Sequence, residues 1–156
     1  MARTTELRLP AHRDYLVVAK RSAAAVGTVA GFDMDAIDDL TIAVSQAMEE
    51  SITSLERWGA RAGEVRLVFK EHPRGLEVVV RSSVSRDAEL EAAERAVQEQ
   101  AARERREAVA VSQRAQERAA EDLALRLIGL FVDDTSYRVD QRTGCLRVRL
   151  TKYRVS

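Results

Sequence analysis

Gln46 and Glu50 stand four residues apart in the stretch DLTIAVSQAMEES. In a helix that spacing places both side chains on one face, one turn apart. Glu50 offers oxygen ligands of the kind that a magnesium ion prefers. Gln46 is neutral and cannot accept a proton as a carboxylate does, so it cannot act as a general base. The pair therefore offers a metal ligand but no general base.

The segment from Asp33 to Leu55 is predicted to be the helix that holds this pair, because its apolar residues recur at steps of three and four. Asp33 is placed to cap the first turn, and Phe32 and Ile37 have the spacing of a hydrophobic staple. One helix face is therefore predicted to be buried. That face comprises Ile37, Leu40, Val44, Ala47, Met48, Ser51, Ile52 and Leu55, and the opposite face comprises Asp39, Ala43, Gln46, Glu50 and Thr53 or Ser54.

This helix resembles the first ATP-binding box of the GHKL ATPases, and in particular of the serine kinases that act as anti-sigma factors. Their box reads roughly D-L-x-I-A-V-S-E-A-x-x-N-A, where the Glu is the general base and the Asn holds magnesium. The present sequence aligns without a gap, with Gln46 at the position of the Glu and Glu50 at that of the Asn. The resemblance implies the family's scaffold with altered chemistry. Gln46 would be an inactive catalytic position, and both residues would belong to a degenerate ATP and metal site.

A hairpin is predicted from two alternating segments, Glu64–Lys70 and Leu76–Arg81. In nucleotide-binding GHKL proteins the second strand leads into D-x-G-x-G, whose Asp bonds the adenine amino group and whose glycines let the backbone pass close to the nucleotide. Here the strand is followed by SSVSR. The adenine-binding Asp and the glycines are absent, and Ser82 is the residue left at this degenerate cofactor site.

The segment from Asp87 to Asp134 is rich in Ala, Glu, Arg and Gln and contains no proline, which predicts helix. The family has its glycine-rich nucleotide lid here, ending in a G-L-G-L-like turn, whereas this chain reads Asp122-Leu123-Ala124-Leu125. We expect residues 87–121 to form an inserted or remodelled lid helix that occupies or covers the place of the lid. A weak apolar stripe along it predicts a homodimer. The stripe comprises Leu90, Val97 and Val111.

The amino-terminal region carries a second match to the same kinases. Glu6–Leu9 alternates like a short edge strand, and Ala11–Ala30 predicts a helix that Gly31 stops. The words L-P-A-x-x-x-Y-L and the later G-F resemble the kinases' amino-terminal region, whose first helix helps contact the sigma factor. The resemblance implies Lys20 and Arg21 as partner contacts, and the alternative is ordinary solvated charge. The core face of this helix is predicted to comprise Tyr15, Val18, Ser22, Ala25, Val26 and Val29.

The carboxy-terminal part restores the resemblance. Leu125–Asp133 resembles the family's last helix, and Ser136–Asp140 with Cys145–Tyr153 predicts a final hairpin. The complete order is β-α-α-β-β-α-β-β. We therefore expect an α+β fold, a two-layer α/β sandwich of the GHKL (Bergerat) type, as a single domain over residues 1–156. Helices are expected on one face of the sheet, with the other face open.

Composition bounds the classes of partner. The 156 residues include 25 basic and 25 acidic side chains, a net charge of +0, so no nucleic-acid partner or anionic membrane is expected. The single cysteine, Cys145, excludes an internal disulfide, fits a reducing cytoplasm and is expected to be a small buried strand residue. There is no apolar signal core and no run of the ~20 residues that a membrane span needs. A cytoplasmic protein with a protein partner is the expectation.

Three functions are compatible with these residues. The favoured one is a regulatory anti-sigma-factor-like protein that binds a sigma factor or a STAS-type antagonist without turning over ATP. The joint loss of the base, the magnesium ligand, the adenine-binding Asp and the phosphate glycines favours it, and predicts that the protein uses no cofactor. The alternative is an active ATP-dependent serine-protein kinase acting on a STAS-domain anti-anti-sigma factor, which would need ATP and magnesium. The third is a structural dimer module built on the long helix.

Overall fold

A computed structural model of the chain describes residues 2–59, 62–84, 107–140 and 142–155. It confirms the predicted α+β class, and the described residues follow the order of strand, two helices, two strands, helix and two strands. A short 3-10 helix, η1 (Arg13–Tyr15), precedes the first α-helix. The elements are β1 (Thr4–Pro10), α1 (Leu16–Val29), α2 (Met34–Arg57), β2 (Gly63–His72), β3 (Gly75–Val84), α4 (Glu107–Ile128), β4 (Asp134–Val139) and β5 (Leu146–Tyr153).

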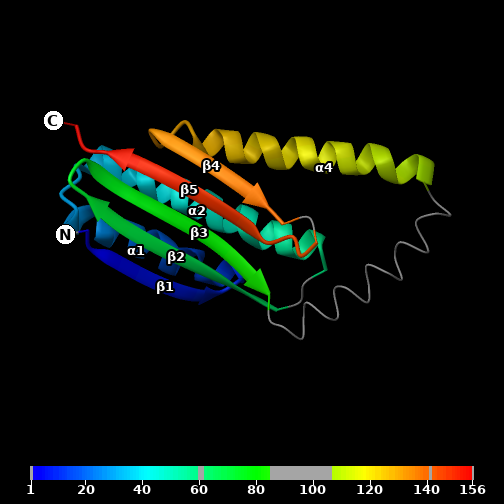
Figure 1. The fold of residues 1–156 in the computed structure, drawn as a ribbon, viewed down its shortest axis with the longest axis horizontal. Coiled ribbons are helices and arrows are strands. Elements are labelled where there is room, and N and C mark those ends of the chain that lie inside the picture. Colours follow the sequence, from blue (N-terminus) through cyan, green and yellow to red (C-terminus); the bar gives the residue numbers. More distant parts are fainter. Residues whose placement is uncertain (1, 60–61, 85–106, 141, 156) are drawn as a thin grey trace.

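The five strands form one antiparallel sheet in the order β1-β2-β3-β5-β4. Figure 1 shows α1 and α2 lying behind this sheet, and α4 running alongside β4. Within the described residues no helix covers the opposite face of the sheet, as expected for a two-layer sandwich. Both predicted hairpins are present, and each strand begins or ends within three residues of its predicted bounds.

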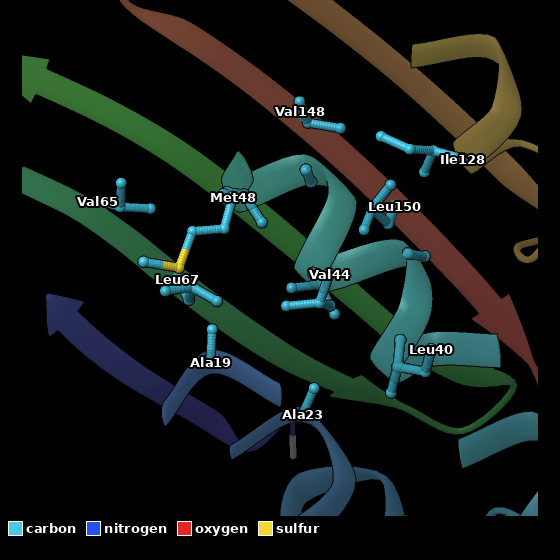
Figure 2. Close-up of a cluster of buried hydrophobic side chains, with 14 of the residues drawn as sticks. Ala19, Ala23, Leu40, Val44, Met48, Val65, Leu67, Ile128, Val148 and Leu150 are labelled. Atoms are coloured by element: carbon cyan, nitrogen blue, oxygen red, sulfur yellow. The ribbon is translucent and has the colours of Figure 1, made fainter. Parts of the chain in front are cut away.

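The core lies between α2 and the sheet. Figure 2 shows Val44 and Met48 of α2 facing Leu67 of β2 and Val148 and Leu150 of β5. Asp33 caps α2 as predicted, since its carboxylate accepts a hydrogen bond of 2.8 Å from the backbone N–H of Ala36. The predicted buried face is confirmed, because all eight of its residues are buried. They are Ile37, Leu40, Val44, Ala47, Met48, Ser51, Ile52 and Leu55.

The prediction that Ala43 lies on the opposite, polar face of α2 is wrong, because Ala43 is buried; of the two alternatives Thr53 and Ser54, Ser54 is buried and Thr53 is not. α2 packs against α1 and α4 as well as against the sheet, so its buried arc is wider than a single face. The polar face that remains is correspondingly narrow. It carries Asp39, Gln46, Glu50 and Thr53, none of which is fully buried.

The predicted core face of the first helix is wrong in part: Ser22 and Val26 are half-buried and Val26 packs against the core, whereas Ala25 is exposed. Tyr15, Val18 and Val29 are 39%, 37% and 66% exposed, and the buried residues of α1 are Ala19, Ala23 and Gly27. This stripe of small residues lets α1 approach α2 closely. A Cβ atom added at Gly27 would lie 3.3 Å from a side-chain atom of Ile37 and 3.4 Å from one of Leu40. Most of the larger apolar residues are therefore exposed, except Leu16 and Val26, which are half-buried against the core.

The helix α4 passes through residue 121 without a break and ends at Ile128, so Leu125–Asp133 is not a separate helix. Of the predicted lid helix, residues 87–106 lie outside the described residues, as do Leu90, Val97 and the side chain of Val111. The predicted homodimer stays a prediction. None of the described helices combines the length and the apolar character that crossing a membrane requires.

Cys145 is a free thiol that lies just before β5. The prediction that it is a buried strand residue is wrong, because it is half-buried and belongs to the turn that connects β4 with β5.

Candidate functional site

The polar face of α2 brings Gln46 and Glu50 together as predicted, one helical turn apart. Gln46 is exposed, whereas Glu50 is half-buried. The Oε2 atom of Glu50 is buried and has no hydrogen-bond partner among the described residues. A buried acceptor without a donor is energetically unfavourable. The exposed amide of Gln46 and the half-buried carboxylate of Glu50 therefore have different environments, although they lie on one face of α2.

Glu50 belongs to a charged cluster that joins α2 to α4. Arg57, two turns further along α2, lies with its Nη1 atom 3.4 Å from Oε2 of Glu121 on α4. The other oxygen of Glu121, Oε1, is buried and has no hydrogen-bond partner in the described part of the chain. Burial raises the pKa of Glu50, Arg57 opposes that rise, and the carboxylates of Glu121 and Glu49 add to it. The helix α4 therefore packs against the carboxyl-terminal end of the polar face of α2.

The cluster predicts a pH-dependent stability. Because the folded-state pKa of Glu50 is raised above its usual value of 4.5, folding favours the protonated form of this carboxyl. As the pH rises from 4.5 through the raised pKa, the carboxyl therefore lowers the free energy of unfolding. Replacing Glu50 by Gln should therefore raise the free energy of unfolding at pH 7 and change it little at pH 4. Urea unfolding at both pH values measures the difference. Glu117→Gln on the exposed face of α4 is the control, and equal effects of Glu50→Gln at the two pH values would contradict the assignment.

Ser82 lies in β3, is buried, and is already bound within the sheet. Its Oγ accepts a hydrogen bond of 2.8 Å from the backbone N–H of Leu146. The same hydroxyl donates a hydrogen bond of 3.3 Å to the carbonyl oxygen of Leu146. A second buried hydroxyl, Oγ of Ser54, donates to the carbonyl of Gly144 at 2.7 Å. Both hydroxyls are therefore engaged by the backbone around the start of β5.

Trp58, the residue that caps the carboxyl end of α2, packs against the turn that connects β4 with β5. Gly144 in the β4–β5 turn has a φ of 70°, and a Cβ atom added there would lie 2.8 Å from Cβ of Trp58 and closer still to its ring. Such a separation is shorter than real Cβ contacts allow. The corner formed by α2, β3 and the β4–β5 turn is therefore closely packed.

The stretch Asp122–Leu125 lies inside α4. In the interior of an α-helix each backbone N–H donates to the carbonyl four residues earlier, so these amides are not available to surround a phosphate. The described residues also contain no group of three or more His, Cys, Asp or Glu side chains that could hold a metal ion. With Ser82 bound to Leu146 and a neutral Gln46, the described residues do not fit Mg-ATP.

Lys20 and Arg21 are exposed on α1, and neither has an ion-pair partner among the described residues. They lie on a different helix from Gln46 and Glu50, so the structure does not bring the predicted partner contacts into the α2–α4 cluster. Val17, one turn before them, is 49% exposed, and Val18 is also exposed because the small residues of α1 face α2. Together these four residues form a surface that is both basic and apolar.

Sequence reasoning missed an ion pair between two stretches that match the family. Nζ of Lys152, in the L-T-K-Y ending, lies 3.0 Å from Oδ2 of Asp39 at the start of the DLTIAVSQ stretch. The same Nζ donates to the carbonyl of Phe131 at 3.0 Å. Opposite charges in the two motifs were the available signal. These two residues therefore connect α2, β5 and the loop after α4, which is a structural role.

A surface depression of ≈ 400 Å³ between α4 and β4 was also not predicted. The hydroxyl of Tyr137 donates to the carboxylate of Asp122 there, and this bond raises the pKa of Tyr137. The depression shares Glu121 with the α2–α4 cluster but contains none of the residues predicted as a site. Its lining consists of Arg118, Ala119, Glu121, Asp122, Tyr137 and Val139.

Comparison with known proteins extends the resemblance over most of the chain. The sequence profile of the histidine kinase-like ATPase domain matches residues 9–152. The serine-protein kinases RsbW of Listeria innocua and Listeria monocytogenes are each 35% identical over 74 residues, 47% of this chain and 46% of the relative. The RsbW of Bacillus thuringiensis is 29% identical over 75 residues, 48% of this chain and 46% of the relative. The chain thus spans about half the length of the curated relatives it matches.

Proposed function

This chain belongs to the histidine kinase-like ATPase domain family, and on that premise we propose that it is a regulatory, anti-sigma-factor-like protein. It binds a sigma factor or a STAS-domain anti-anti-sigma factor by surface contact, without turning over ATP. In this role it needs neither ATP nor magnesium.

One observation carries the proposal. A regular helix, α4, packs on the polar face of α2 through the Arg57–Glu121 pair, and residues 122–125 lie within that helix. Phosphoryl transfer depends mainly on positioning and on electrostatic stabilisation by preorganised donors. A helix interior offers no free backbone donors, and Gln46 offers no base. The family scaffold therefore supports binding better than it supports catalysis.

The exposed surface of α1 supports a protein partner. Lys20 and Arg21 stand beside the exposed Val17 and Val18. Apolar contacts surrounded by charged side chains are the usual composition of a protein interface, in which the charges contribute to specificity and association rate. Lys20 and Arg21 therefore remain the proposed partner contacts.

The alternative is an active serine-protein kinase. The relatives' names favour it, and so does Glu50, whose buried oxygen has no hydrogen-bond partner among the described residues and could ligate a cation. Against it stands Gln46, because loss of a general base commonly lowers the rate by a factor of ~100 to 10,000. The two functions differ in whether phosphate reaches the partner.

The deciding experiment mixes the purified protein with the sigma factors and STAS-domain proteins encoded beside its gene, with and without Mg-ATP. We expect a complex by calorimetric titration with the same dissociation constant in both conditions, and no phosphorylation of either protein by mass spectrometry. Lys20→Ala combined with Arg21→Ala should weaken the complex about tenfold or more, because two interfacial charges are lost.

Arg74→Ala is the matched control, since Arg74 is an exposed arginine that belongs to the β2–β3 turn and not to α1. It should leave the dissociation constant unchanged within about twofold. Transfer of the γ-phosphate to a STAS-domain protein would establish the kinase instead. Failure of every such protein to bind would remove the proposed function.

A further inference from the structure

Five arginines form a continuous row across the sheet, one on each strand. The strand register pairs Arg8 of β1 with Arg66 of β2, Arg66 with Arg81 of β3, Arg81 with Arg147 of β5, and Arg147 with Arg138 of β4. Directly paired residues of antiparallel strands point to the same face. The five side chains therefore share one face and form a single line perpendicular to the strands. We refer to this set as the arginine row.

The arginine row lies on the open face of the sheet. The residues that precede and follow Arg147, namely Leu146 and Val148, are buried in the core, and successive strand residues point to opposite faces. The core side is the side of α1 and α2, which lie behind the sheet in Figure 1. The row is therefore on the face that no described helix covers, opposite the surface proposed for α1.

The positive charge of the row is neutralised only at one end. Glu6 pairs with Arg8 at 3.1 Å and with Arg66 at 2.5 Å, so one carboxylate serves two guanidinium groups. Even there the Nε atom of Arg66 is buried and has no partner among the described residues. The other three arginines are exposed and have no ion-pair partner in the described part of the chain. They are Arg81, Arg138 and Arg147.

The residues beside the row favour a protein partner over nucleic acid. Unpaired bases are commonly bound by stacking on aromatic side chains. Neither the arginine row nor the neighbouring register row that includes Glu6 contains an aromatic residue. That neighbouring row carries two valines at its centre, of which Val68 is half-buried and Val79 is buried, so the apolar surface beside the positive charge is that of Val68. Its members are Glu6, Val68, Val79, Arg149 and Ser136.

We propose that the arginine row is a docking site for an acidic helix of a partner protein, one with carboxylates along a single face. Neighbouring strands lie ~4.8 Å apart, so the five arginines span ~19 Å. Glutamates at three- and four-residue steps of a helix are ~4.5 to 6 Å apart along its axis, which matches that spacing. Alternate residues of an extended segment are ~6.6 Å apart and match it less well. Guanidinium groups bind carboxylates in a bidentate geometry, and the half-buried Val68 would contact the apolar flank of the helix.

This inference does not rest on the proposed function, because the row is on the opposite face from α1 and uses none of the residues of the α2–α4 cluster.

The test uses two fluorescent alanine-based peptides of ~16 residues, enough to span the row. Both have the same number of glutamates. In the stripe peptide the glutamates stand at three- and four-residue steps, and in the scattered peptide they are distributed around the helix. Fluorescence anisotropy with the full chain at low ionic strength should show the stripe peptide binding about tenfold more tightly than the scattered one.

Arg81→Glu combined with Arg147→Glu should weaken binding of the stripe peptide at least about tenfold. The matched control is Arg74→Glu with Arg154→Glu, which makes the same change of net charge at two exposed arginines outside the row and should leave binding within about twofold. Arg81→Gln with Arg147→Gln removes the two charges without adding repulsion and should give a smaller loss. Circular dichroism of each variant verifies that the fold is retained.

Three results would overturn the proposal. The first is equal affinity for the two peptides, and the second is unchanged affinity of the Arg81→Gln, Arg147→Gln variant. The third is tighter binding of oligo(dT) or of phosphatidylserine vesicles than of the stripe peptide, which would assign the row to phosphate groups.

Discussion

Replacing Gly144 by Ala is expected to lower the free energy of unfolding by about 2–5 kcal/mol, measured by urea denaturation. Two effects add. The φ of 70° at Gly144 lies in the left-handed region, which costs a residue with a Cβ atom roughly 1–2 kcal/mol. The new methyl group would also overlap with Trp58, and overpacking typically costs about 1–3 kcal/mol. The closed corner would have to open.

Gly31→Ala separates these two effects. Gly31 has a φ of 80°, but a Cβ atom added there would meet nothing within 4 Å. This variant should therefore lose only the roughly 1–2 kcal/mol of backbone strain. Gly144→Ala should also recover part of its loss when Trp58 is replaced by Ala. Equal losses for Gly144→Ala and Gly31→Ala would show that the corner is not tightly packed.

Replacing Ala23 by Leu is expected to lower the free energy of unfolding by about 1–3 kcal/mol, because the side chain would be forced between α1 and α2. Ala23 is 0% exposed and lies on the small-residue stripe of α1 with Ala19 and Gly27. The larger side chain would push α1 away from α2. Thermal unfolding followed by circular dichroism measures the loss.

The matched control is Ala25→Leu, the same chemical change two residues further along the same helix. Ala25 is exposed, so this variant should change stability by no more than about 0.5 kcal/mol. The predicted core face favours the reverse, because it includes Ala25 and does not include Ala23. A larger loss for Ala25→Leu than for Ala23→Leu would restore that prediction.

The comparison of α1 with α2 explains which parts of the fold could be predicted from sequence. In α2 the apolar residues are large and regularly spaced, so periodicity identifies the buried face, and all eight predicted residues are buried. In α1 nearly every position is small or apolar, and burial is decided by how closely two helices can approach. A Cβ atom added at Gly27 would lie within 3.4 Å of Ile37 and Leu40 across that interface. Such a contact is a property of a pair of helices and cannot be read from the period of one.

The candidate site likewise has a part that could be predicted from local sequence and a part that could not. The four-residue spacing of Gln46 and Glu50 was sufficient to place them on one face, because it depends only on the local geometry of a helix. The proximity of Glu121 to Arg57 depends on how α4 packs on α2, across more than sixty residues of sequence. The arginine row required the register of all five strands. Composition could not predict it, since a net charge of +0 carries no information about which face holds which sign.

The two hydrogen bonds of Ser82 also limit which residue this position can hold. An ionised aspartate there would have no hydroxyl with which to donate to the carbonyl of Leu146. It would also place a charge at a site that is 1% exposed. Replacing Ser82 by Asp would therefore reduce stability before it supplied any nucleotide contact. The hydrogen bonds that make Ser82 part of the sheet thus oppose a carboxylate at this position.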